Sequence, residues 1–147
     1  MEIKLTVEYC DDYVGEPLKF AHETDACFDF YNNEKEPITL KPLERYAFSL
    51  GVKVEFPVGY VLTIHPRSGN AIKKGIGMLN SEGVIDQGYR DTIKAILFNG
   101  STEEITINPG DKIAQGRLEA LVPVSICAGK VDENTERGLG GFGSTGM

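Results

Sequence analysis

The chain has 147 residues, of which 41% are hydrophobic and 25% are charged, and its formal net charge at pH 7 is -7. This length and balance are typical of one soluble globular domain. The negative charge excludes general nucleic-acid binding, which depends on clustered Lys and Arg side chains that neutralise phosphates. A phosphate-binding function would therefore use a few placed cations.

The start of the chain and its cysteines predict a cytoplasmic protein. No basic region followed by a long apolar run opens the sequence, and no apolar stretch approaches the ~18 residues of a membrane span. We therefore expect neither a signal peptide nor a membrane anchor. Cys10, Cys27 and Cys127 form no C-x-x-C pair, which is typical of free thiols in a reducing compartment rather than of disulfides or a zinc site.

Short strands separated by turn signals make up most of the predicted secondary structure. Ile3, Leu5 and Val7 alternate with polar residues, as they would in a half-buried strand. Further strand-like runs cover residues 46–56, 60–65, 91–99 and 103–107, and only residues 68–74 predict a helical turn. This pattern indicates an antiparallel β sandwich or barrel rather than βαβ units. We expect the chemistry of such a fold to lie on its loops.

The first polar cluster is ETDACFDFYNN, residues 23–33, which carries Asp25 and Asp29 in a predicted polar loop. Acids here can hold Mg²⁺ through water, because magnesium keeps several waters and takes few direct protein ligands. Most loop aspartates are turn formers, so this segment alone leaves both interpretations open.

The second cluster is HPRSGNAIKKGI, residues 65–76, which brings Arg67 and Ser68 to the start of the predicted helical turn. An arginine, a hydroxyl and free backbone N–H groups at a helix start can cradle an anion. On this segment alone, a solvated arginine at a strand end with a serine cap is an equal alternative.

The third cluster is LNSEGVIDQGYRDTI, residues 79–93, which we predict to be a hairpin with polar groups at its mouth. Asp86 follows an apolar Val-Ile pair, so we expect its carboxylate near buried surface, where it suits a general base that activates water. Tyr89 would present a flat ring to a sugar or a base. The alternative is a plain turn aspartate and a packed tyrosine.

The fourth and fifth clusters lie near the end of the sequence. GDKIAQGRLEAL, residues 110–121, would point Gln115 from a strand as a neutral donor. RGLGGFGSTGM, residues 137–147, includes the spacing G-x-G-x-x-G, but a dinucleotide fold needs a strand before it, a helix after it and an acid about 20 residues further on. The sequence ends at Met147, so a flexible tail or a lid over an anion remains.

In this order the five clusters resemble the five motifs of the trimeric dUTPase family. DACFDFYN resembles the first motif, PRSGNAIKKGI the second, LNSEGVIDQGYR the third, GDKIAQ the fourth and RGLGGFGSTG the fifth. The resemblance implies an all-β jelly roll, or distorted β-barrel, that forms a homotrimer. It also implies Mg²⁺-assisted hydrolysis of dUTP to dUMP and pyrophosphate, which limits uracil incorporation into DNA and supplies dUMP for dTMP synthesis.

The resemblance further implies roles for single residues. Asp86 would be the general base that orients water toward the α-phosphorus, and Tyr89 would stack under the deoxyribose. The uracil edge would be read by Asn80 and by the backbone from Gly83 to Ile85. The residues implied to contact phosphates are Arg67, Ser68, Gly69 and Gln115. Asp29 would reach Mg²⁺ through water.

For the tail, the resemblance implies a lid, residues 137–147, that reaches over from a neighbouring subunit, with residues 1–136 as the core of the same domain. Phe142 would cover the uracil ring, and Gly143 would also touch the substrate. The γ-phosphate would be held by Arg137, Ser144 and Thr145. Each active site would thus draw its motifs from three subunits.

Departures from the motif pattern are local. Cys27 stands where the first motif usually has glycine, and Gly88 and Asp91 replace the more usual Asp and Gly of the third. After Gln115, a Gly-Arg pair replaces the usual apolar pair, which makes Arg117 a candidate extra cation near the phosphates.

Two other functions on the same fold compete with this interpretation. A dCTP deaminase needs a glutamate on the strand after the third motif, where alignment on Asn99 places Ile96. A non-catalytic nucleotide-sensing protein would lack the base or the lid, whereas Asp86 and the whole tail are present.

Overall fold

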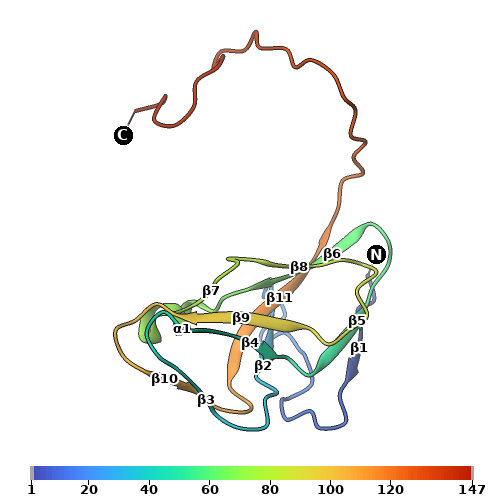
Figure 1. Cartoon of the computed structure of the whole chain (residues 1–147). Coiled ribbons are helices and arrows are strands. Elements are labelled where there is room, and N and C mark those ends of the chain that lie inside the picture. Colours follow the sequence, from blue (N-terminus) through green and yellow to red (C-terminus); the bar gives the residue numbers. More distant parts are fainter. Residues whose placement is uncertain (1, 147) are drawn as a thin grey trace.

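The computed structural model describes residues 2–146, and their regular secondary structure is almost entirely short antiparallel strands (Figure 1). The all-β prediction is therefore confirmed, and Met1 and Met147, the outer ends of the predicted core and lid, lie outside the described residues. The elements are β1 (Thr6–Tyr9), β2 (Phe28–Tyr31), β3 (Ile38–Leu40), β4 (Arg45–Ser49), β5 (Val52–Glu55), β6 (Tyr60–His65), α1 (Ser68–Lys74), β7 (Ile76–Met78), β8 (Gly83–Ile85), β9 (Lys94–Asn99), β10 (Ile105–Ile107) and β11 (Lys112–Ala120). In the described part of the chain, no helix is both long and apolar enough to pass through a membrane.

The strands form small sheets around one core. A four-stranded sheet has the order β2-β11-β6-β8, a three-stranded sheet has the order β4-β9-β7, and two further pairs are β1-β5 and β10-β3. Strands that are distant in sequence, such as β2 and β11, are hydrogen-bonded neighbours. Such pairing between distant strands is typical of Greek-key and jelly-roll folds.

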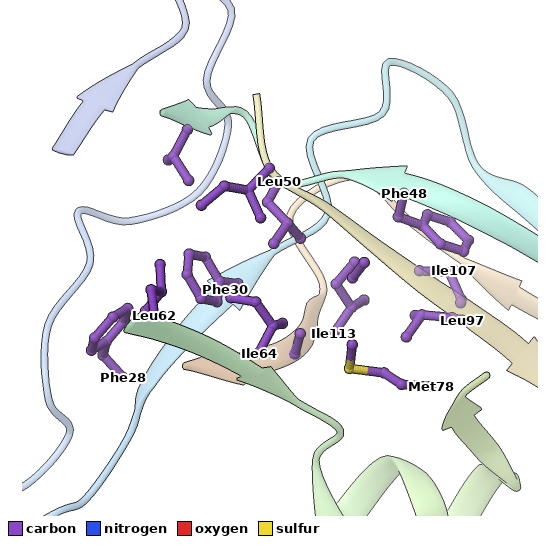
Figure 2. Packing of buried hydrophobic residues seen from close by; sticks show 14 of the residues in the cluster. Phe28, Phe30, Phe48, Leu50, Leu62, Ile64, Met78, Leu97, Ile107 and Ile113 are labelled. Carbon is purple, nitrogen blue, oxygen red and sulfur yellow. The ribbon is translucent and has the colours of Figure 1, made fainter. Parts of the chain in front are cut away.

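The alternation of side chains along the four-stranded sheet separates the core from a polar face. Phe30 and Leu62 point into the core and are fully buried (Figure 2). On the other face, Gln115 lies directly opposite Asp29 on one side and His65 on the other. Since directly opposed residues of antiparallel strands share a face, the pairing that builds the core also gathers these polar groups.

The helical turn at residues 68–74 and the strand at residues 60–65 are confirmed to the residue as α1 and β6. The run 46–56, predicted as one strand, is two strands, β4 and β5. Gly51 breaks it with a φ of 66° in the left-handed region. A Cβ at Gly51 would also lie 2.4 Å from Cγ of Asn33, so both conformation and space require glycine at this turn.

Two other local predictions are wrong. Asp29 lies within β2 rather than in a loop. Residues 79–93 are not a hairpin, because β7 pairs with β9 while β8 pairs with β6. A turn closed by the bond from Ser81 N–H to Met78 O, 3.0 Å long, therefore carries the chain from one sheet to another.

After β11 the chain leaves the core as an extended arm, which we define as residues 121–146 (Figure 1). The arm has no helix or strand, and all its residues are exposed. Its first residue, Leu121, still donates a backbone hydrogen bond to Gly59 O at 2.8 Å. The predicted lid therefore lies at the far end of a longer segment that leaves the core.

Candidate active site

Three of the five sequence clusters meet at one end of the four-stranded sheet. A cavity of about 380 Å³ opens between β2, β11 and the segment that joins β6 to α1. Its lining includes the residues of the first, second and fourth clusters that were predicted to bind phosphate or magnesium, namely Asp29, Arg67, Ser68, Gly69 and Gln115. The fold thus brings together the first, second and fourth clusters within one chain.

Both oxygens of the Asp29 carboxylate are held by cations. Arg67 Nε lies 2.9 Å from Oδ1, and Lys112 Nζ lies 3.0 Å from Oδ2. The Asp29 side chain is only 19% exposed, so water screens these pairs less than it screens pairs on the open surface. The hydrogen bond to Asp29 raises the pKa of Lys112, which keeps its ammonium group charged.

The start of α1 presents unpaired backbone donors beside this ion-pair group. The first helical bond runs from Ala71 N–H to Arg67 O at 3.0 Å. In the part of the chain that the structure describes, no side-chain hydrogen bond caps the N–H groups of the first turn, and space is open around Gly69. Arg67 and these N–H groups fit the anion cradle that the sequence predicts.

Gln115 fixes the loop that leads into this cradle. Its Nε2 donates a hydrogen bond of 2.9 Å to Pro66 O, immediately before Arg67. An amide nitrogen has two hydrogens, so one donor remains for a ligand. The predicted phosphate contact of Gln115 and its observed loop contact are therefore compatible.

The third cluster lies apart from the cavity, whose lining within residues 2–146 includes none of its members. Asp86 follows β8, and its backbone oxygen accepts a bond of 3.0 Å from Tyr89 N–H. The Tyr89 hydroxyl donates to Thr92 O at 3.1 Å. In the single chain Asp86 is exposed, whereas the sequence led us to expect it near buried surface. Asn80 and the strand from Gly83 to Ile85 are likewise not among the described residues that line the cavity.

The fifth cluster lies at the end of the arm, and the hydrogen bonds recorded for residues 137–146 stay within the arm. Arg137 Nε donates to Gly140 O at 2.9 Å, and the Phe142 side chain is fully exposed. Gly143, Ser144 and Thr145 are exposed beside it. One chain therefore assembles the predicted phosphate pocket but keeps the predicted base and lid away from it.

The residues that depart from the motif pattern have identifiable neighbours. Arg117 Nε donates to Glu119 Oε1 at 2.6 Å, and Arg117 is not among the residues that line the cavity. Cys27 does line the cavity, and burial raises the pKa of its thiol. All three cysteines are free, as predicted. Asp91 accepts a bond of 2.7 Å from Thr92 N–H, and the space around Gly88 is open.

Sequence reasoning missed Lys112, and a β-bulge explains why. Lys112 and Gln115 are three positions apart, so regular alternation would place them on opposite faces of β11. The register shifts between Lys112 and Ala114, which returns Lys112 to the face of Asp29. The lysine within GDKIAQ was the available signal, but the bulge is not visible in the sequence.

Solved structures establish the class of fold. A Staphylococcus bacteriophage 80alpha dUTPase solved with dUPNHPP superimposes with a TM-score of 0.86 at 24% sequence identity, covering 98% of this chain and 99% of that chain. A dUTPase from phage phi11 of S. aureus gives a TM-score of 0.78 at 23% identity, covering 90% and 99%. This chain therefore has the jelly-roll fold of those structures.

Sequence comparison then establishes the family. The dUTPase family model matches residues 15–146. The deoxyuridine 5'-triphosphate nucleotidohydrolase of Hydrogenobaculum sp. is 46% identical over 110 residues, 75% of this chain and 76% of that protein. The protein of the same name from Clostridium novyi is 41% identical over 145 residues, 99% and 100% of the two chains. The chain belongs to the dUTPase family.

Proposed function

We propose that this chain hydrolyses dUTP to dUMP and pyrophosphate, by Mg²⁺-assisted attack of water on the α-phosphorus. Family membership supports the substrate. The observation that carries the chemistry is the cavity in which Arg67 and the first-turn N–H groups of α1 lie beside the Asp29 carboxylate. Fixed donors of this kind stabilise a triphosphate without making the protein basic as a whole.

The donor set at the cavity fits a magnesium ion that arrives with the nucleotide. Magnesium usually takes one or two carboxylates together with substrate phosphates and keeps several waters. Asp29 supplies a carboxylate that two cations hold in place. When bound, the ion would neutralise charge on the phosphates, with Asp29 reaching it through water.

The third cluster would supply the base-reading surface and the general base. Among the strands of the described residues, β8 lies at the edge of its sheet and pairs with β6 alone, so outward backbone groups of Gly83–Ile85 are available to hydrogen-bond a uracil edge. Asn80 would add a side-chain contact, and Tyr89 would pack under the deoxyribose. Asp86 would take the proton of the attacking water.

We propose that these parts meet in a homotrimer with shared active sites. The separation of the third cluster from the cavity in one chain supports this arrangement. So does the arm, where Val122, Val124 and Ile126 are 81%, 79% and 97% exposed and alternate with Pro123 and Ser125. Within residues 2–146 this strand-like alternation pairs with no strand, and a neighbouring subunit would cover it.

Within the trimer, residues 1–136 would form the jelly-roll core with the first part of the arm, and residues 137–147 the lid. Phe142 would cover the uracil, Gly143 would let the backbone approach the substrate, and the γ-phosphate would be held by Arg137, Ser144 and Thr145. Closing the lid would expel water and strengthen the phosphate contacts. The three free cysteines agree with a cytoplasmic enzyme that limits uracil incorporation into DNA and supplies dUMP for dTMP synthesis.

The decisive test is a pyrophosphate-release screen with Mg²⁺ across dUTP, dTTP, dCTP and UTP. We expect turnover of dUTP and little of the other three, because a 5-methyl, a cytosine amino group or a 2′-hydroxyl would not fit the proposed site. Release of ammonia from dCTP would instead identify a deaminase. Nucleotide binding without turnover would identify a non-catalytic sensing protein.

A further inference from the structure

Lys112 is a cation beside the cavity to which the motif assignments give no role. Its Nζ lies 3.0 Å from Oδ2 of Asp29, while Arg67 Nε lies 2.9 Å from Oδ1 of the same carboxylate. We propose that Lys112 is a positioning residue for nucleotide binding, which holds the Asp29 carboxylate and leaves Nη2 of Arg67 available for phosphate. This inference rests on the proposed function.

The charges of the three side chains support this role. Two cations around one carboxylate give the group of Asp29, Arg67 and Lys112 one net positive charge, which offsets the second carboxylate of the cavity lining, Asp25, when a polyanionic ligand enters. Without the Lys112 ammonium, Arg67 would be matched one to one by Asp29, and the group would be neutral. The side chain of Asp29 is 19% exposed and that of Arg67 is 32% exposed, so water only partly screens this change.

The side chain and the backbone of Lys112 have different partners. The Lys112 carbonyl oxygen accepts bonds from Asn70 Nδ2 at 3.0 Å and from Arg67 Nη1 at 3.5 Å. At the bulge, the main chain of β11 is therefore hydrogen-bonded to side chains at the start of α1. A substitution at Lys112 keeps this carbonyl, so it removes the ammonium while the loop connection stays in place.

The ammonium itself is held from two sides. Besides its bond to Asp29, Lys112 Nζ lies 5.8 Å from the centroid of the Tyr31 ring, over the ring. Tyr31 lies directly opposite Lys112 across the sheet and is almost fully buried. A buried ring and a fixed carboxylate keep the ammonium in one place, as a positioning role requires.

The test compares Lys112→Met and Lys112→Arg with the full-length wild-type chain. Lys53→Met is a matched control, because the side chain of Lys53 is 40% exposed against 43% for Lys112 and also pairs with a carboxylate, that of Glu8 at 3.5 Å. We measure KM and kcat for dUTP, thermal midpoints, and calorimetric binding of a non-hydrolysable dUTP analogue with Mg²⁺ and of dUMP.

We expect Lys112→Met to raise KM and the Kd of the analogue about fivefold, the upper range for a partly exposed ion pair. The thermal midpoint, kcat and dUMP binding stay close to wild type, because dUMP lacks the β- and γ-phosphates. Lys112→Arg restores analogue binding, and Lys53→Met leaves all values unchanged. A lower thermal midpoint with unchanged KM and Kd would show a structural role only and overturn the proposal.

A double-mutant cycle with Asp29→Asn tests the route of the effect. If Lys112 acts through Asp29, then Lys112→Met has little further effect on analogue binding in the Asp29→Asn background. An equal loss in both backgrounds would overturn the positioning role, and Lys112→Gln serves the same cycle if the methionine variant does not fold. Absence of dUTP turnover by the wild type would refute the proposed function, whereas analogue binding reports on Lys112 in either case.

Discussion

The backbone of Gly116 lies directly against the ring of Phe30 in the core. A Cβ at Gly116 would stand 2.5 Å from Cε2 of Phe30, whose side chain is fully buried. The glycine therefore provides space for a large aromatic residue on the neighbouring strand. This close approach gives a physical reason for the departure from the usual apolar pair after Gln115.

We predict that Gly116→Ala lowers the free energy of unfolding by about 1–3 kcal/mol, the usual cost of overpacking a core. Phe30→Leu introduced together with it should recover part of the loss, because the smaller side chain vacates the space. Urea denaturation curves measure both effects. Gly88→Ala is the control, since nothing lies within 4 Å of a Cβ at Gly88. Equal stability of the Gly116 and Gly88 variants would contradict this account.

For Asp86 we predict that substitution by Asn removes catalysis but not binding. Loss of a general base typically costs 10²–10⁴ in rate, while the amide keeps the size of the carboxylate. Pyrophosphate release measures the loss, and titration with a non-hydrolysable dUTP analogue measures the retained affinity. Asp91→Asn is the control in the same segment, because its side chain accepts a bond from Thr92 N–H that an amide oxygen also accepts. Retained turnover by Asp86→Asn would exclude it as the base.

At the scale of elements, the sequence predicts the strands and helices whose pattern is formed by residues adjacent in the chain. β6 is a mostly apolar run between Gly59 and Pro66, and α1 follows at once, so both are predicted to the residue. β2 was predicted as part of a polar loop that carries Asp25 and Asp29, and the polar residues Asn32 and Asn33 follow it directly. Both asparagines are buried, and Asn32 Nδ2 donates to Asn108 O at 2.9 Å. In a sequence, buried asparagines such as these cannot be told apart from the polar residues of an exposed loop.

The sequence predicts several residues of the candidate site but does not predict that they meet at one cavity. The resemblance names Asp29, Arg67 and Gln115, but their meeting at one cavity depends on the pairing of β2 with β11, which are far apart in the chain. No local pattern predicts that pairing. The same holds for Lys112, whose place beside Asp29 depends on a bulge.

For the lid we predict that deletion of residues 137–147 lowers turnover of dUTP by about 10²-fold or more, because the closed cover that orders the phosphates is lost. The thermal midpoint should stay unchanged, since the hydrogen bonds recorded for residues 137–146 stay within the arm. Phe142→Ala is a milder test of the lid, and Leu139→Ala is its control. Both side chains are exposed, but only Phe142 is assigned to uracil. Full activity of the truncated chain would contradict the lid.

At the scale of the whole molecule, one chain carries every proposed part but does not bring them together. The phosphate cavity, the surface with Asp86 and the end of the arm lie in three separate places. The arm extends from the core (Figure 1), and its alternating apolar residues Val122, Val124 and Ile126 are exposed. Activity should therefore depend on assembly, and the unit of function would be the trimer.

A mixture of two inactive variants tests this dependence directly. In a shared site the base and the lid come from different subunits, so Asp86→Asn chains and chains lacking residues 137–147 should complement each other after they are unfolded and refolded together. With random assembly, half of the sites receive an intact Asp86, and half of those receive an intact lid. We therefore expect about a quarter of the wild-type pyrophosphate release.

The control mixes the same two variants after each has been refolded separately, which leaves the trimers unmixed and inactive, and sedimentation velocity verifies the trimers in both samples. The co-refolded mixture recovers activity only if base and lid act across a subunit boundary. If each chain instead completed its own site, every chain would keep one defect and no activity would return. Co-refolded trimers that stay inactive would thus refute the shared site while leaving the assignments of Asp86 and the lid intact.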